Sequence, residues 1–278
     1  MESFVKHTKD RDDNQSERAR LNDQHDVFIH AMKGNTILAP VDLTQTGLRI
    51  LDSGTADGRW LLHISSTSPG QHTYIGTDID DALYPSPAPA NMHFQNQSIR
   101  EPFPTEWEGA FDLVHQRLVM AAAPPATLLS VVERLAGLLK PGGWLQLVEV
   151  DTDSAATNGP ELKRFLGYAQ QLSVLGGMGP NLAKQLAGTL RDAGLRNVEE
   201  RSIDVKYGAA NEEEDLKKKS INSLCDAVPP LMQGVQMMMP DKYSQDEAAS
   251  FQARLRKELE EAGGCTKLLV VWGQRSTI

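Results

Sequence analysis

The stretch Arg49-Ile50-Leu51-Asp52-Ser53-Gly54-Thr55-Ala56-Asp57-Gly58-Arg59-Trp60 decides the fold of this chain. A short apolar run ends on an acid, passes through a turn of small residues and continues into an apolar segment that suits a helix. The two glycines allow backbone angles and close approaches that a Cβ atom would prevent. We therefore predict a strand, a glycine turn and a helix. In a doubly wound α/β sheet this first crossover is where nucleotide-like ligands bind.

The spacing of the turn narrows the choice of ligand. It reads Asp-x-Gly-x-Ala-x-Gly, which differs from the glycine patterns of dinucleotide folds and of phosphate-binding loops. A phosphate is therefore not the expected ligand, and a tight turn that binds nothing is the alternative. A second short strand, His72–Asp78, ends on an acid 26 positions after Asp52. An acid at that place is suited to accept both hydroxyls of a ribose.

At these residues the sequence resembles the class I S-adenosylmethionine-dependent methyltransferases. The segment Phe111–Arg117 is similar to the fourth strand of that family, and Leu138–Glu149 is similar to its "LKPGG" turn and fifth strand. The segment Glu17–His25 resembles an amino-terminal segment of the fungal branch, whose members are small-molecule and regulatory methyltransferases of secondary metabolism. Together these motifs cover roughly residues 17–151, and the carboxyl-terminal half matches only loosely.

The resemblance implies a Rossmann-like α/β fold, with a mostly parallel seven-stranded sheet, helices on both faces and a helical cap. We expect a disordered tail over residues 1–15 and a methyltransferase domain over residues 16–278. Within that domain we expect an amino-terminal helical lid over residues 16–40 and a cap or substrate region over residues 152–240. The apolar run Lys267–Gly273 predicts a closing strand at the edge of the sheet.

The resemblance also implies S-adenosylmethionine as cofactor. The residues expected to bind it are Asp52, Gly54, Thr55, Gly58, Asp78, Ile79, Ser98, Ile99 and His115. Many relatives carry an acid where Ser98 stands, so the adenine contact here rests on the Ser98 hydroxyl or the adjacent backbone. Ala56 stands at the central glycine of the turn and narrows the space beside the cofactor. Its methyl group is tolerated if its backbone angles are ordinary.

The chemistry of methyl transfer sets what the site needs. Displacement at a sulfonium requires donor carbon, sulfur and acceptor held in line, so positioning supplies much of the catalysis. No catalytic nucleophile is required, and the sequence contains neither a Gly-x-Ser-x-Gly elbow nor a metal-ligand cluster. A hydroxyl or amine acceptor needs a base to remove its proton. His115, at the end of the fourth strand, is the first candidate, and the alternative is a histidine that merely lines the strand.

Three further positions complete the candidate site. In the family the amino-terminal helix closes over the cofactor, which places Gln24 and the candidate catalytic residue His25 at the roof. The alternative for both is a partly buried polar pair. Arg117 either orients a carboxylate or carbonyl of the acceptor or pairs with Glu149 or Asp151. Either acid is also a candidate partner for an amine substrate.

Composition excludes several classes of function. The formal charge of −9 over 278 residues provides no basic face for nucleic acid. Cys225 and Cys265 are too few for a disulfide framework or a zinc site. The chain has no apolar secretory core at its start and no apolar run of about eighteen residues that would span a bilayer. We expect a cytoplasmic monomer or homodimer without metal, nucleic acid or membrane partners.

The sequence therefore predicts an S-adenosylmethionine-dependent methyltransferase that acts on an O or N atom of a small-molecule natural product. Two alternatives remain because a fold does not fix a function. One is a methyltransferase-like protein that uses the cofactor pocket for cyclisation or pericyclic rearrangement. The other is a non-enzymatic regulator of secondary metabolism.

Overall fold

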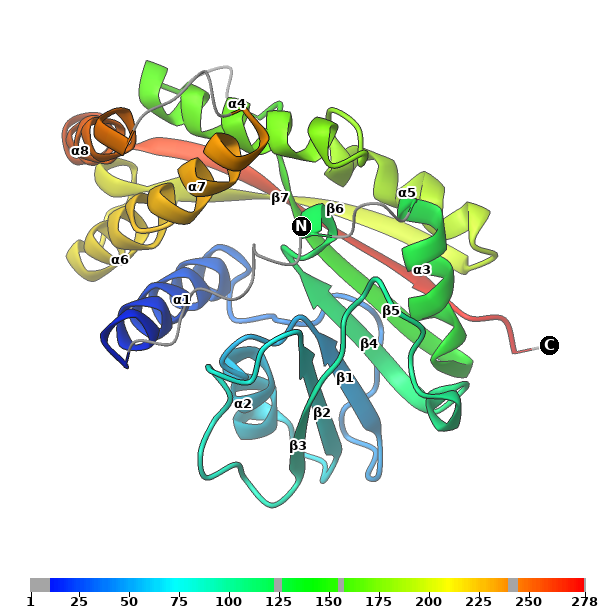
Figure 1. The fold of residues 1–278 in the computed structure, drawn as a ribbon. Coiled ribbons are helices and arrows are strands. Elements are labelled where there is room, and N and C mark those ends of the chain that lie inside the picture. The colour runs from blue at the N-terminus through cyan, green and yellow to red at the C-terminus, as the bar shows by residue number, and fades with distance from the viewer. Residues whose placement is uncertain (1–10, 123–126, 155–157, 240–244, 278) are drawn as a thin grey trace.

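The computed structural model describes residues 11–122, 127–154, 158–239 and 245–277. Within them, seven strands form one sheet in the order β3-β2-β1-β4-β5-β7-β6 (Figure 1). The strands from β3 to β5 are parallel, whereas β7 is antiparallel to both of its neighbours. Their bounds are Arg49–Ser53 (β1), Thr73–Asp78 (β2), Met92–Asn96 (β3), Phe111–Arg117 (β4), Leu139–Asp151 (β5), Arg196–Tyr207 (β6) and Gly264–Gln274 (β7). The predicted Rossmann-like fold is confirmed.

Helices cover both faces of the sheet (Figure 1). The helices α3 and α5 pack on one face, and α1, α2, α4, α6, α7 and α8 lie on the other. Their bounds are Arg11–Ala31 (α1), Arg59–Thr67 (α2), Leu128–Gly137 (α3), Pro160–Leu175 (α4), Leu182–Asp192 (α5), Glu214–Cys225 (α6), Val228–Met238 (α7) and Gln245–Glu261 (α8). None of the described helices has the length and apolar character that crossing a membrane requires.

The amino-terminal helix is longer than predicted. Helix α1 begins at Arg11, so residues 11–15, which we expected in a disordered tail, are helical. No glycine or proline interrupts the chain between Arg11 and Gly34, and the polar residues there are compatible with a helix. Gly34 follows the helix with a φ of 82°, as expected for a stop. The rest of the predicted tail, residues 1–10, lies outside the described residues.

The final strand is internal, and the prediction of an edge strand was wrong. Strand β7 lies between β5 and β6, so β6 forms that edge of the sheet. The run Leu268–Trp272 is almost completely buried. A strand covered on both faces is apolar at successive positions, whereas a strand with one solvated face alternates with polar residues. The continuous apolar run was therefore the signal of a central strand.

A buried side chain ties the segment after α1 to the sheet. Gln146 of β5 is completely buried, and its Oε1 accepts hydrogen bonds from the backbone N–H groups of Leu38 (2.7 Å) and Ala39 (3.1 Å). Its Nε2 donates to the carbonyl oxygen of Thr36 at 3.0 Å. Three backbone polar groups of a connecting segment are thereby satisfied by one side chain. The amino-terminal helix is thus anchored at its carboxyl end to the centre of the sheet.

We expect Gln146→Leu to lower the free energy of unfolding by about 3 kcal/mol, because three buried backbone groups would lose their partner. Gln170→Leu is the matched control. The Gln170 amide hydrogen bond to Asp153 is exposed, so this change should stay within about 0.5 kcal/mol. Urea unfolding followed by circular dichroism measures both. Equal losses in the two variants would contradict the anchoring role of Gln146.

Candidate active site

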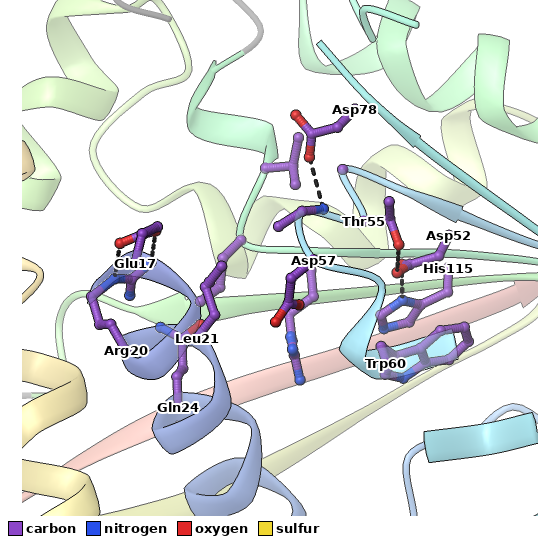
Figure 2. Close-up of a pocket in the computed structure, with 15 residues that line it drawn as sticks. Glu17, Arg20, Leu21, Gln24, Asp52, Thr55, Asp57, Trp60, Asp78 and His115 are labelled. Carbon is purple, nitrogen blue, oxygen red and sulfur yellow. Dashed lines mark hydrogen bonds and ion pairs between the residues drawn. The ribbon is translucent and has the colours of Figure 1, made fainter. Parts of the chain in front are cut away.

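A pocket of about 380 Å³ lies where β1 turns into α2, beneath α1 (Figure 2). Its volume falls within the range of small-molecule sites. The carboxyl ends of β1, β2 and β4 and one face of α1 provide its walls. The lining residues are Glu17, Arg20, Leu21, Gln24, Asp52, Gly54, Thr55, Ala56, Asp57, Trp60, Asp78, His115, Arg117, Leu118 and Val119. The described residues contain no cluster of side chains suited to a metal ion.

One stripe of α1 forms the roof of the pocket. Glu17, Arg20, Leu21 and Gln24 follow the spacing of residues on one side of a helix. Arg20 donates to both carboxylate oxygens of Glu17, through Nε at 2.8 Å and Nη2 at 2.6 Å (Figure 2). Gln24 thus lies where the roof was expected. The other three residues were not predicted, although their spacing in the sequence would have identified the stripe.

His25 does not line the pocket, which removes the contact expected of it as a catalytic residue at the roof. Its side chain is buried, and its ring centroid lies 5.1 Å from that of His63 on α2. One residue further along a helix points about 100° away, so His25 packs between helices while Gln24 faces the cavity. Neither ring nitrogen has a hydrogen-bond partner among the described residues. Burial lowers the pKa of His25 to about 2, so its ring is neutral.

The glycine turn adopts left-handed backbone angles at three alternating positions. Gly54 has a φ of 76°, Ala56 of 49° and Gly58 of 71°. The angles of Ala56 are therefore not the ordinary ones that we expected to make its methyl group tolerable, and a left-handed alanine costs about 1 kcal/mol. A Cβ atom at Gly54 would overlap the side chain of Val119. The first glycine is thus required by both its angle and its packing.

Asp78 holds the turn from the neighbouring strand. Its Oδ2 accepts a hydrogen bond from the Ala56 N–H at 2.9 Å, and its Oδ1 accepts one from the Ile79 N–H at 2.8 Å. Burial raises the pKa of Asp78, and these two bonds oppose the shift. Each carboxylate oxygen still has a lone pair to offer, because two oxygens provide about four acceptor sites. The residue expected at the ribose therefore lies in the pocket with acceptor capacity left.

Asp52 and His115 form a buried pair in the pocket wall. His115 Nδ1 lies 2.7 Å from Asp52 Oδ1, and the Thr55 hydroxyl donates to Asp52 Oδ2 at 2.8 Å (Figure 2). The indole of Trp60 stacks on the His115 ring at 3.8 Å between centroids and 3° between planes. Burial lowers the pKa of His115, and the neighbouring Asp52 opposes that shift. Each oxygen of Asp52 therefore accepts one hydrogen bond from a protein group. Asp52 also lines the pocket, and its expected contact with the cofactor stays a prediction.

The two acids at the end of β5 do not pair with Arg117. Glu149 Oε1 accepts the backbone N–H groups of Val119 (3.1 Å) and Met120 (3.0 Å), and burial raises its pKa to about 7. Asp151 accepts a hydrogen bond from Asn181 at 2.8 Å. Both acids belong to the wall behind the pocket, and neither lines it. Glu149 instead fixes the segment that follows β4.

Three of the residues expected to bind the cofactor, Ile79, Ser98 and Ile99, do not line this pocket. The hydroxyl of Ser98 accepts a hydrogen bond from the Arg100 N–H at 3.1 Å, and the side chain of Ile99 is buried in the core beside α3. Ile79 is 44% exposed. Their contacts with the cofactor, and that of Ser98 with the adenine, therefore stay predictions.

The pocket residues fit S-adenosylmethionine, which carries a sulfonium, an ammonium and a carboxylate. Four acids line the pocket, namely Glu17, Asp52, Asp57 and Asp78, against two arginines. This excess of negative charge suits a cofactor with one net positive charge. Asp78 is available for the ribose hydroxyls, and Gly54, Thr55 and Gly58 belong to the turn that such a ligand would follow. Asp57 and Trp60 stand within the fold-deciding stretch, yet we had not predicted them as site residues.

Comparisons with known proteins identify the family of this chain. A family model described as a methyltransferase domain matches residues 23–200. The chain is 39% identical over 270 residues to the N-methyltransferase sirN of Leptosphaeria maculans. This alignment covers 95% of this chain and 93% of sirN. It is 35% identical over 267 residues to the N-methyltransferase gliN of Aspergillus fumigatus, with 93% of each chain covered. A solved phosphoethanolamine N-methyltransferase 2 of Haemonchus contortus aligns at a TM-score of 0.57 and 14% identity, over 99% of this chain and 60% of that one. The last likeness shows the fold alone.

The glycine turn allows a paired test. We expect Gly54→Ala to lower the free energy of unfolding by roughly 2–4 kcal/mol, because the new methyl group meets Val119 at a left-handed position. Ala56→Gly should instead raise it by up to about 1 kcal/mol, because a left-handed alanine is relieved. Thermal unfolding of both variants measures the two shifts. Shifts of the same sign would contradict the backbone angles of the turn.

The raised pKa of Glu149 predicts how the free energy of unfolding depends on pH. Because its pKa is raised to about 7 in the folded state, the folded protein binds the proton more tightly than the unfolded chain does. Wild-type stability relative to Glu149→Gln should therefore be highest below about pH 4.5 and should fall by roughly 2–3 kcal/mol between pH 5 and pH 8. Glutamine keeps an acceptor oxygen for the two N–H groups and does not ionise. Urea unfolding of both proteins at pH 5 and pH 8 measures the difference, and parallel pH profiles would exclude the raised pKa.

Proposed function

Because the chain belongs to the class I S-adenosylmethionine-dependent methyltransferases, we propose that this enzyme methylates a nitrogen atom of a small-molecule natural product. The domain match and the full-length relatives make S-adenosylmethionine its cofactor. The sequence left O and N acceptors open. The names of sirN and gliN, both N-methyltransferases, favour nitrogen. A cytoplasmic location and a monomeric or dimeric state stay predictions.

The observation that carries the proposal is the Asp52–His115 pair in the pocket wall. A carboxylate oxygen of Asp52 accepts, so we assign the proton of their 2.7 Å hydrogen bond to His115 Nδ1. In a neutral imidazole the other nitrogen, Nε2, then has a free lone pair. The lowered pKa of His115 keeps the ring neutral at pH 7. His115 is therefore suited to receive the proton that an acceptor N–H releases when it is methylated.

The remaining pocket residues position the reactants. The bound cofactor supplies an electrophilic methyl group on a sulfonium. We assign Asp78 to the ribose hydroxyls of the cofactor. We assign the left-handed turn from Gly54 to Gly58 to the methionine chain that is attached to the ribose. Trp60 holds the plane of the His115 ring by stacking at 3.8 Å, which limits the directions from which Nε2 accepts a proton. The α1 stripe covers the cavity and reduces its contact with water.

The alternatives from the sequence receive less support. A regulatory role leaves the Asp52–His115 pair without a chemical task. The relatives sirN and gliN, each covered over 93% of its length, are named for methyl transfer, not for cyclisation or regulation.

We expect His115→Gln to lower kcat by roughly 10²–10⁴-fold, because the proton acceptor is lost, while the affinity for S-adenosylmethionine changes little. Asp52→Asn should also lower kcat, because its amide can hold the ring in the wrong tautomer. His93→Gln, at an exposed position of β3, is the control and should leave kcat unchanged. Transfer of a labelled methyl group to a panel of amine and amide natural products, each with an analogue that offers only hydroxyl groups, measures all three.

The pH dependence of kcat is a second readout. With its pKa lowered, His115 stays neutral below the ordinary histidine value, so kcat should remain constant from neutral pH down past that value. Methylation of the hydroxyl analogues alone would refute the choice of nitrogen. Full activity of His115→Gln on a nitrogen acceptor would refute the assigned base.

A further inference from the structure

We propose that Arg117 binds the carboxylate of the methionine part of the cofactor. The sequence had assigned this guanidinium to the acceptor, or to a pairing with an acid of β5. The inference rests on the cofactor, which the family fixes, and it does not depend on which acceptor the enzyme uses.

Arg117 has no directly paired anion among the described residues. Within the described part of the chain its guanidinium makes no hydrogen bond or ion pair, and its contact is a cation–π interaction with the ring of Phe28 at 5.5 Å. Asp52 and Asp57 stabilise its charge at longer range. Each oxygen of Asp52 already accepts one hydrogen bond, from Thr55 or from His115. A partly buried charge without a paired neighbour is costly, so a ligand that brings an anion gains from it.

The other arginine of the pocket is already satisfied. Arg20 makes a bidentate pair with Glu17, at 2.8 and 2.6 Å, and its side chain is 12% exposed. The three remaining lining acids, Asp52, Asp57 and Asp78, would repel a ligand carboxylate. Among the lining residues, Arg117 is therefore the position where the carboxylate of the cofactor meets an uncompensated positive charge.

The sheet places Arg117 at the required end of the cofactor. Asp78 ends β2 and Arg117 ends β4, and β1 with its glycine turn lies between them. Strands that are two positions apart are separated by about 10 Å. In the cofactor the ribose hydroxyls and the carboxylate also lie on opposite sides of the sulfur. A ligand whose ribose is held by Asp78 and whose chain crosses the turn thus ends beside β4.

The chemistry of the guanidinium suits this partner. A carboxylate accepts two parallel N–H bonds from an arginine fork, and such charge-assisted bonds are stronger than neutral ones. A lysine would provide one point charge in place of the fork. The expected contribution of the carboxylate to affinity is on the order of 10²-fold.

The test is calorimetric titration with two ligands that differ in one group. The ligands are S-adenosylhomocysteine and its decarboxylated analogue, which keeps the ammonium and the thioether. Wild-type protein should bind S-adenosylhomocysteine on the order of 10²-fold more tightly than the analogue. Arg117→Met should abolish this preference by weakening S-adenosylhomocysteine alone. Arg20→Met is the matched control, and it should change the affinities for both ligands by the same factor.

The outcomes separate the possible roles of Arg117. An equal loss of both ligands in Arg117→Met would mean that the residue shapes the pocket without reading the carboxylate, and would overturn the proposal. An unchanged preference in that variant, or its selective loss in Arg20→Met, would also overturn it. If Arg117→Met does not fold, Arg117→Lys is measured instead, and it should reduce the preference without removing it. Because no acceptor is present, none of these results depends on the proposed methylation of nitrogen.

Discussion

The hydrogen bond between His115 and Asp52 is the constraint on which the pocket depends. The two residues stand opposite each other in the parallel ladder of β1 and β4, so the register of the sheet itself brings them together. Thr55 fixes the second oxygen of the acid, and Trp60 covers the ring of the base. One buried network thereby joins the end of β1, the glycine turn, Trp60 at the start of α2, and β4. Such a network is strong when every member is satisfied, and through His115 it forms part of the cavity wall.

Local sequence patterns predicted those helices and strands whose periodicity and end residues are visible in the sequence. The glycine turn, the strand that ends on Asp78 and the helix Pro160–Leu175 follow from short-range periodicity and from breakers at their ends. The position of β7 did not follow from such rules, because its neighbours are chosen by tertiary packing. Its uninterrupted apolar run nevertheless held the information that both faces are covered.

The side chains of the site were predicted less well than the elements that carry them. A shift of one residue along α1 separates Gln24, which faces the cavity, from His25, which does not. The sequence resemblance identified the segment but did not show in which direction each of its side chains points. The partners of charged groups were equally hidden, because Arg20 finds its acid three residues away on the same helix, whereas Arg117 has none among the described residues. The left-handed angle of Ala56 was hidden as well, since alanine rarely adopts it.

Two sets of residues on α1 have separate roles, one in the core and one in the roof of the cavity. One side packs Val27 and Phe28 into the core, while Glu17, Arg20, Leu21 and Gln24 contribute to the cavity and carry little of that packing. The surface offered to a substrate can therefore be redrawn at four positions without repacking the interior. Changes within about two turns of α1 would therefore alter the roof of the cavity while the side chains on the sheet stay the same.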